Sequence, residues 1–388
     1  MSGIVLSASV RQNLLSLQDT ASLLSTTQNR LATGNKVNSA LDNPTNFFTA
    51  QGLDNRASDI NNLLDSIGNG VQVLQAANTG LTSLQKLVDT AKSIANQVLQ
   101  APAGYTAKST STSTTLVGTA SAANLVDGVG FTANQTLAIA ANGELPAITV
   151  TFGATESLDQ LNTSLAAGGL TASIDSGNHL VITTTNDYAG QKVGTITPGT
   201  APGTTTFGAA TTPTADAASQ AIRTSLVGQY NNIITQITTT SQDSSFNGIN
   251  LLNGDNLKLT FDETGKSTLN ITGVTYNATG LGLGSLTSGT DFLDNASANA
   301  ALTKLSAAST TLRTEASALG SNLSVVQLRQ DFNKSLINVL QTGSSNLTLA
   351  DANQEAANSQ ALSTRQSIAV SALSLANQSQ QSVLQLLR

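Results

Sequence analysis

The sequence predicts a mainly α-helical protein with a β-rich insertion, in which both chain ends form one antiparallel coiled-coil bundle of long helices. Two observations predict this class. Apolar residues recur at alternating steps of three and four at both ends, which is the spacing of helices that pack along one another. Between the ends the period changes to the alternation typical of strands. We therefore expect the ends to pair and the middle to form an insertion at the far tip.

The first helix is expected over residues 10–33. Its predicted seam follows steps of four and three and comprises Val10, Leu14, Leu17, Ala21, Leu24, Gln28 and Leu31. Gly34 is the predicted C-cap, because glycine readily adopts the left-handed conformation that ends many helices. The polar residues that follow predict a turn or the start of a new helix; they are Asn38, Ser39, Asp42, Asn43 and Pro44.

The second helix is expected over residues 45–100, with a long apolar seam. Gly68, Gly70 and Gly80 lie inside it, and each costs up to about 1 kcal/mol of helix stability relative to alanine. Either the helix bends at these glycines or a neighbouring segment approaches them closely.

The last third of the chain mirrors the first. A seam from Leu302 to Leu340 predicts one long helix, and a break is expected at residues 343–346. The last helix is expected from Leu349 onward. One face of it carries Ala369, Leu373, Ala376, Gln380, Val383 and Leu387.

The middle of the chain is predicted to hold a small α+β module. The Ser/Thr run at 109–115 is expected to be a loop, and residues 197–214 a return linker. Residue periodicity predicts a strand at 147–152, a helix at 156–167, a hairpin of 171–174 and 179–185, a helix at 217–240, and a hairpin of 257–261 and 267–272.

The composition excludes several classes of function. The chain has 388 residues and a net charge of −6, with seven acidic and two basic residues between Tyr105 and Gln220, which argues against nucleic-acid binding. It has no cysteine and one histidine, which excludes disulfides and multi-histidine metal sites. The first residues do not resemble a Sec signal, and no apolar run has the length of a membrane span.

Three patterns that could indicate chemistry are better explained as structure. His179 would need a nucleophile and an orienting acid to act as a base. Residues 265–267 (GKS) lack the earlier glycine of a P-loop. Asp255, Asp262 and Glu263 lack the spacing of a calcium-binding EF-hand loop. We therefore predict that the protein is not an enzyme and has no catalytic residue, no metal site and no cofactor.

Three segments resemble elements of one protein family, in the family's order. Residues 30–40 (RLATGNKVNSA) are similar to an RLSSGxRINSAxDD element, residues 246–254 (FNGINLLNG) to an FNGxxLLxG turn, and residues 376–388 (ANQSQQSVLQLLR) to an ANQxPQxVLxLLR terminus. With their helical flanks, residues 1–104 and 218–388, these segments resemble bacterial flagellin, the filament subunit of the flagellum.

The resemblance implies three domains. Residues 1–42 and 349–388 would form an inner core of terminal helices. Residues 43–104 and 218–348 would form a helical shell with one β-hairpin, and residues 105–217 a solvent-exposed variable α+β domain. It also implies export through the flagellar channel and a place in the extracellular filament.

The expected function is self-assembly through the terminal helices into the filament used for swimming. The residues expected at the assembly interface are Val10, Leu14, Leu17, Leu24, Leu31, Ala369, Leu373, Ala376, Val383 and Leu387. The shell motif is expected to be Phe246, Asn247, Gly248, Asn253 and Gly254. Two alternatives stay open: a hook–filament junction protein, which shares the terminal helices, and a secreted adhesin that carries the middle module on a coiled-coil stalk.

The resemblance also implies partners. These are further copies of the chain, a flagellar export chaperone, and the hook-associated junction and cap proteins, with no nucleic acid and no membrane. Flagellins sensed by the Toll-like receptor carry a stretch like LQRVRELAVQSAN, and residues 84–96 here are LQKLVDTAKSIAN. Lys86 stands where that stretch has arginine, whose planar fork lysine cannot reproduce, and Thr90 stands where it has leucine. We therefore expect weak or absent sensing.

Overall fold

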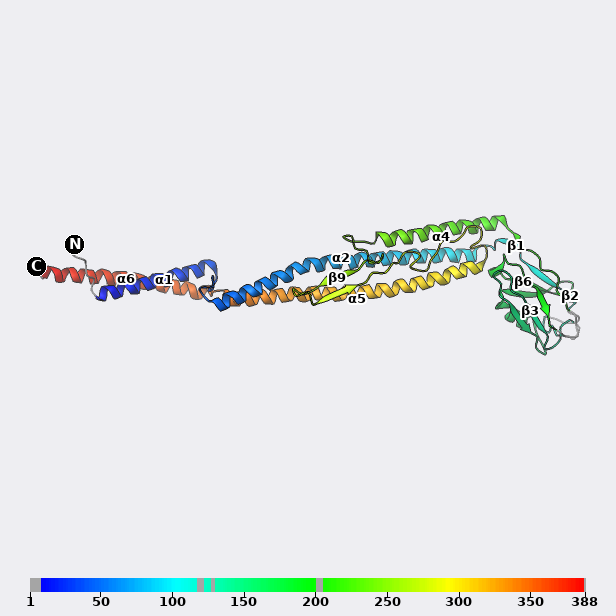
Figure 1. Cartoon of the computed structure of the whole chain (residues 1–388), viewed down its shortest axis with the longest axis horizontal. Helices are drawn as coiled ribbons and strands as arrows, with labels where there is room; N and C mark the ends of the chain where they lie inside the picture. The colour runs from blue at the N-terminus through cyan, green and yellow to red at the C-terminus, as the bar shows by residue number, and fades with distance from the viewer. Residues whose placement is uncertain (1–7, 117–121, 127–129, 200–204, 387–388) are drawn as a thin grey trace. The chain divides into compact units, whose positions relative to one another are not determined.

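The computed structural model, drawn in Figure 1, divides by its internal contacts into two compact units. It describes residues 8–116, 122–126, 130–199 and 205–386. The terminal unit comprises the chain up to Gly70, Lys258–Leu269, and the chain from Val325 onward. The middle unit comprises Val71–Leu257 and Asn270–Ser324. Among the described residues, no helix is both long and apolar enough to cross a membrane.

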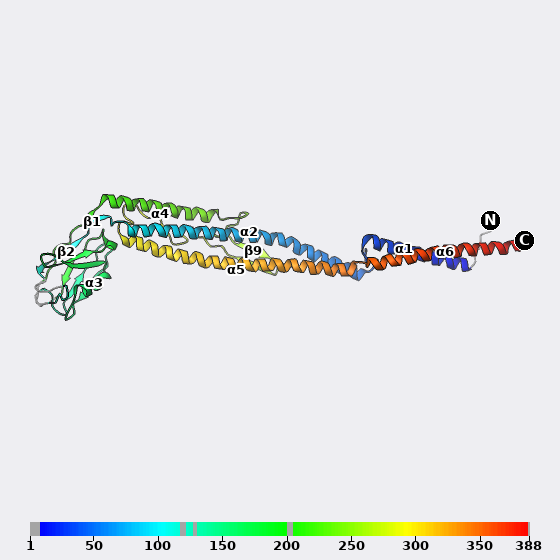
Figure 2. The same cartoon turned by 180° about the vertical axis from the view of Figure 1, so that it is seen from behind.

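The two ends of the chain pair as predicted. In the terminal unit α1 (Ala8–Thr33) and α6 (Ala352–Leu386) run antiparallel and lie side by side, seen from the front in Figure 1 and from behind in Figure 2. Gly34 has a φ of +72°, as expected of a C-cap. The backbone N–H of Ala350 donates to the carbonyl of Gly34 at 2.9 Å, and this bond ties the two helices together where they meet the rest of the unit.

The break predicted at residues 343–346 is wrong. Helix α5 (Asn295–Thr348) runs straight through it, and the chain leaves the helix at Leu349. The helix continues through these residues because they pack against α2: the Ser344 Oγ is buried and donates to the Asp54 Oδ2 at 2.8 Å. A glycine inside a helix costs about 1 kcal/mol, so one glycine with a well-packed neighbour does not end a helix.

Helix α2 (Pro44–Gln100) is continuous, which confirms the predicted second helix. The Asn43 Oδ1 accepts a hydrogen bond from the Asn46 N–H at 3.0 Å, which satisfies one free donor of the first turn. In the terminal unit the heptad positions of α2 and α5 meet in one apolar cluster of Ala57, Ile60, Ile337 and Leu340.

Two of the three glycines inside α2 allow close approach of a neighbour. A Cβ at Gly70 would lie 2.3 Å from a methyl group of Leu259, and a Cβ at Gly80 would lie 2.2 Å from the Ser244 Oγ. At Gly68 the nearest atom would be 4.0 Å away. Of the two explanations that the sequence left open, close approach is therefore correct at Gly70 and Gly80.

The helices of the middle unit pack on the predicted seams. The buried heptad residues of α2 include Leu74, Leu81 and Val88, and those of α5 include Leu305, Leu312 and Leu319. Helix α4 (Ala217–Asp243) confirms the predicted helix at 217–240, and its N-cap is Asp216, whose side chain accepts from the Ala218 N–H.

The rest of the middle unit is a β-rich region. Its core is a cluster of apolar residues between Leu125 and Ile196, including the stacked rings of Phe131 and Phe152. One sheet has the order β2-β6-β5 and another the order β4-β3-β7, while β1 pairs with β8. The elements are β1 (Tyr105–Ala107), β2 (Thr110–Leu116), β3 (Thr136–Ile139), β4 (Ile148–Thr151), α3 (Leu158–Ala166), β5 (Leu170–Ile174), β6 (His179–Thr184), a 3-10 turn (Asn186–Tyr188), β7 (Ile196–Pro198) and β8 (Thr214–Ala215).

The loop predicted at residues 109–115 is wrong, because most of this run is strand β2. Its serines are buried: the Ser109 Oγ donates to the Thr211 carbonyl at 2.6 Å and the Ser111 Oγ to the Gly208 carbonyl at 2.8 Å. The predicted linker at 197–214 is also partly wrong, since Gly208 and Thr211 donate backbone hydrogen bonds to β2. Small hydroxyl side chains can line the inside of a strand when each hydroxyl finds a carbonyl.

The predicted hairpin near residues 257–272 is confirmed. Strands β9 (Leu257–Thr260) and β10 (Thr268–Ile271) form a two-stranded sheet. In the connecting turn Gly265 has a φ of +72°, and the Asp262 Oδ1 accepts from the Ser267 N–H at 2.9 Å. The Asp262 carboxylate accepts hydrogen bonds within this turn, and they lower the pKa of its carboxyl; the largest effect comes from the Thr264 hydroxyl and the next from the Ser267 N–H. Asp262 therefore stabilises the turn.

Candidate functional site

The face of α1 that packs on α6 is offset from the predicted seam. The least exposed residues of α1 follow steps of three and four and comprise Val10, Asn13, Leu17, Thr20, Leu24 and Thr27. The predicted seam shares Val10, Leu17 and Leu24 with this face. Leu14, Ala21 and Gln28 of the predicted seam lie one residue further along the chain than Asn13, Thr20 and Thr27 and are exposed, whereas Leu31 follows Leu24 by seven residues and is exposed near the end of the helix.

Four leucines of α1 are therefore left exposed. Leu14 is 38% exposed, Leu31 43%, Leu23 53% and Leu15 61%. The buried positions between them are polar, and the Thr20 hydroxyl is satisfied by the Ser16 carbonyl at 2.7 Å. A helix that buries threonine and exposes leucine presents apolar surface to something outside its own unit.

Helix α6 shows the same division into two faces. Ala369, Leu373 and Ala376 are half-buried, whereas Ile368 and Leu375 are exposed. The half-buried positions continue toward the start of the helix with Ser359, Leu362 and Gln366, at the same steps as on α1. Leu387 and the side chain of Val383 lie outside the described residues.

Among the described residues, one ion pair joins α1 to α6. The Arg30 Nη1 lies 3.4 Å from the Glu355 Oε1, and Glu355 is 8% exposed. The Arg30 Nε and the Glu355 Oε2 are also buried, and neither has a hydrogen-bond partner. The carboxylate therefore depends on this single guanidinium contact.

The motif at residues 246–254 forms two turns at the end of α4. Phe246 and Ile249 exchange two backbone hydrogen bonds of 3.0 Å, and the two residues between them, Asn247 and Gly248, both have positive φ, of 50° and 80°. This is the geometry of a tight turn, for which Asn-Gly is the favoured pair. Gly254 has a φ of +95° and closes the second turn.

Asn250 is the organising residue of this motif, and the sequence analysis missed it. Its Nδ2 donates to the carbonyls of Ser241 and Gln242 at 2.8 Å, and its Oδ1 accepts from the Leu252 N–H at 2.9 Å. The side chain thus caps the last turn of α4 and folds the following chain back onto it. A signal was present, because an asparagine between two apolar residues rarely serves packing alone.

Arg223 is a second residue that the sequence did not reveal. It is 1% exposed, and burial lowers the pKa of its guanidinium. The Nε donates to the Pro102 carbonyl at 2.7 Å and the Nη1 to the Phe292 carbonyl at 2.8 Å. The Nη2 donates to the Ala101 carbonyl and to the Asn295 Oδ1, both at 3.0 Å. Arg223 thereby holds the end of α2 and the start of α5 to the first turns of α4.

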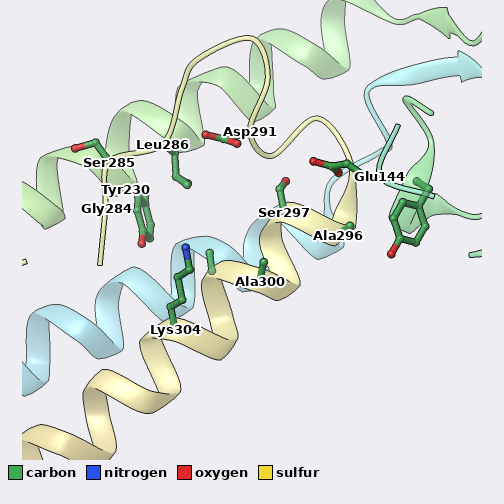
Figure 3. Close-up of a pocket in the computed structure, with 12 residues that line it drawn as sticks. Glu144, Tyr230, Gly284, Ser285, Leu286, Asp291, Ala296, Ser297, Ala300 and Lys304 are labelled. Atoms are coloured by element: carbon green, nitrogen blue, oxygen red, sulfur yellow. The ribbon is translucent and has the colours of Figure 1, made fainter. Parts of the chain in front are cut away.

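The middle unit also contains a cavity of about 520 Å³ beside α4 and the start of α5 (Figure 3). Tyr230 and Lys304 point into it from the two helices, and Asp291, Ser297 and Glu144 also line it. Burial raises the pKa of Tyr230 to about 12, so its hydroxyl stays protonated at neutral pH. This lining gives no basis for assigning a reaction.

The remaining residues that the sequence singled out lie on the surface. His179 begins β6, and its backbone N–H donates to the Asp175 Oδ1 at 2.8 Å, which lowers the pKa of that carboxyl. Lys86 and Thr90 are exposed on α2, and the Thr90 hydroxyl donates to the Lys86 carbonyl at 2.9 Å. Among the described residues, no three His, Asp or Glu side chains are grouped so that they could hold a metal ion.

Comparison with known proteins decides the family. A family model of the bacterial flagellin N-terminal helical region matches residues 5–126, and one of the bacterial flagellin C-terminal helical region matches residues 302–387. Together they cover more than half of the chain and both helices of the terminal pair. The chain belongs to the bacterial flagellin family. The matched regions of this flagellin include α1 and α6, the two helices that pair in the terminal unit.

Individual flagellins show the same relationship. Flagellin FljM of Caulobacter vibrioides is 32% identical over 164 residues, which are 42% of this chain and 59% of that protein. Flagellin FljO of the same organism is 30% identical over the same shares of the two chains. Flagellin A of Rhizobium meliloti is 37% identical over 93 residues, 24% of each chain. The match thus spans about three fifths of the length of the Caulobacter flagellins.

Proposed function

We propose that this flagellin is the subunit of a bacterial flagellar filament and that it assembles through its terminal helices. Membership of the flagellin family supports the filament role. The observation that carries the proposal is the exposure of Leu14, Leu15, Leu23 and Leu31 on a helix that also packs on α6. Fully burying one leucine contributes about 1.5–3 kcal/mol, so a few such residues per subunit can drive association.

We assign different tasks to the residues expected at the interface. Val10, Leu17, Leu24, Ala369, Leu373 and Ala376 stabilise the helix pair of one subunit. Leu14 and Leu31 contact neighbouring subunits, and Val383 and Leu387 remain proposed contacts. A head-to-tail arrangement follows, because two different surfaces must meet for a filament to grow without closing.

The domain division expected from the sequence also remains a proposal. Residues 1–42 and 349–388 would form the assembly core, and residues 43–104 and 218–348 the shell. Residues 105–217 would form the variable domain, and the self-contained apolar core of the β-rich region supports this part. The motif at 246–254 would stabilise the shell by capping α4.

We propose a structural role without catalysis, outside the cell and in the filament. Membership of the flagellin family suggests as partners further copies of the chain, an export chaperone, and the junction and cap proteins of the filament. We propose no role for nucleic acid or membrane. Sensing by the Toll-like receptor would be weak. A Lys86→Arg/Thr90→Leu variant should activate a receptor reporter cell more strongly than the unchanged chain, whereas nanomolar activation by the unchanged chain would contradict weak sensing.

Electron microscopy of protein seeded with short filament fragments tests the filament role. The complete chain should form long tubes, whereas chains that lack residues 1–40 or 350–388 should not. Tubes from a truncated chain would place the assembly contacts elsewhere. Monomers in every sample, across salt and seed conditions, would reject the filament role.

A further inference from the structure

The rotation of α1 on α6 does not follow from hydrophobicity. The buried face contains Asn13, Thr20 and Thr27, and the predicted seam would have buried Leu14, Ala21 and Gln28 instead. Turning α1 about its axis by about 50°, half of one residue step, would exchange the two sets. Since burying Leu14 rather than Asn13 is favourable, another interaction holds α1 in the observed rotation.

The Arg30–Glu355 contact is that interaction. Arg11, Asp19 and Arg365, the other charged residues of the two helices, are exposed, so this ion pair is the charged layer of the described seam. Glu355 is buried with its Oε2 already unpartnered. Turning α1 toward Leu14 would carry Arg30 away and leave the whole carboxylate buried and unpaired, which is strongly unfavourable.

We infer that Arg30 and Glu355 are positioning residues that set the rotation of α1 and thereby hold Leu14 outward for a second copy of the chain. The inference rests on the proposed function for the identity of that partner. Buried polar pairs that fix the register or rotation of packed helices at some expense of apolar burial are known from coiled coils.

Thiol labelling tests the rotation directly, because the chain has no cysteine of its own. Thr20 is 4% exposed and the adjacent Ala21 is exposed. In an otherwise unchanged chain, a Thr20→Cys variant should therefore label at least about tenfold more slowly than an Ala21→Cys variant. Adding Glu355→Gln or Arg30→Gln should bring the two rates close together.

Rescue separates positioning from general loss of structure. Arg30→Lys keeps the charge and should keep the labelling difference, and the exchange Arg30→Glu/Glu355→Arg should restore it. Arg365→Gln, which removes an exposed charge from the same helix, is the matched control and should change nothing. Equal labelling of the two cysteines in the parent chain, an unchanged difference in Glu355→Gln, or failure of both rescues would overturn the inference.

Polymerisation connects the rotation to assembly. The Glu355→Gln variant should polymerise only at a protein concentration about tenfold higher than the unchanged chain needs, because about one leucine is lost from a subunit contact. The exchange variant Arg30→Glu/Glu355→Arg should polymerise at the same concentration as the unchanged chain. A parent chain that labels as expected but never polymerises would reject the proposed function and leave the rotation intact. Normal polymerisation of Glu355→Gln with equalised labelling would overturn the link to the second copy.

Discussion

Single buried polar residues hold separate segments of the chain together. Arg223 joins the ends of two long helices through four hydrogen bonds, and Asn250 folds the chain back at the end of α4. Glu355 pairs with a residue 325 positions away. Each of these groups has partners that only the folded chain brings to it, so removing one leaves a buried group without that partner.

Asp294 should make the stability of the middle unit dependent on pH. It lies near Arg223 and is 7% exposed, and burial raises the pKa of its carboxyl above the usual value of 3.8. The hydrogen bond from Ser297 and the charge of Arg223 oppose this shift, and Glu144 adds to it. The folded chain therefore binds the proton more tightly than the unfolded chain, and this stabilisation is complete below pH 3.8 and is lost as the pH rises through the raised pKa.

The variant Asp294→Asn should consequently be more stable than the parent chain at pH 7, by about 0.5–1 kcal/mol, and gain little at pH 4. Asparagine keeps an acceptor for the Ser297 N–H, so the start of α5 stays capped. Urea unfolding at the two pH values measures the difference. The exposed Asp89→Asn should show no such pH dependence, and an equal gain at both pH values for Asp294→Asn would contradict the assignment.

At the scale of elements, the sequence predicted what depends on local pattern. Heptad spacing located α1, α2, α5 and α6, because a helix seam repeats within the element itself. The strand β2 was missed, since serines that bond to carbonyls around 208–211 look like low-complexity loop until those carbonyls are in place. The rotation of α1 was missed for the same reason, because it depends on Glu355 at the other end of the chain.

Glycines inside the long helices should respond to substitution in opposite directions. Gly80 in α2 faces Ser244 and Leu252, which a Cβ would approach to 2.2 and 2.7 Å, whereas Gly228 in α4 has no atom within 4 Å of that position. Gly80→Ala should therefore destabilise the middle unit by about 1–3 kcal/mol. Gly228→Ala should stabilise it by up to about 1 kcal/mol through the better helix propensity of alanine.

Urea unfolding of both variants measures this contrast in one unit of the same chain. A double variant should show roughly the sum of the two effects, because no atom lies within 4 Å of the Cβ position at Gly228 and the two substitutions therefore share no neighbour. Stabilisation by Gly80→Ala would show that Ser244 can move aside at little cost. That result would mean that Gly80 is not required for the packing of α2 against Ser244 and Leu252.

For the whole molecule, the β-rich region should be separable from assembly. The apolar core of this region draws on residues between Leu125 and Ile196, so it packs largely on itself. The chain enters and leaves the region at adjacent points, where Tyr105 pairs with Ala215 and the Asp216 N–H donates to the Gly104 carbonyl at 2.9 Å. A short connection can therefore replace the region without pulling α2 and α4 apart.

We expect a chain in which a Gly-Ser linker of about four residues replaces residues 106–214 to keep its helices and to polymerise like the parent chain, because the exposed leucines of α1 are untouched. Circular dichroism and electron microscopy of the same sample check both points. Adding Leu17→Pro to the shortened chain should break α1 and abolish polymers while the middle helices remain. Retained helices without polymers in the shortened chain itself would show that the β-rich region takes part in subunit contacts, and the separation of assembly from the variable region would then be wrong.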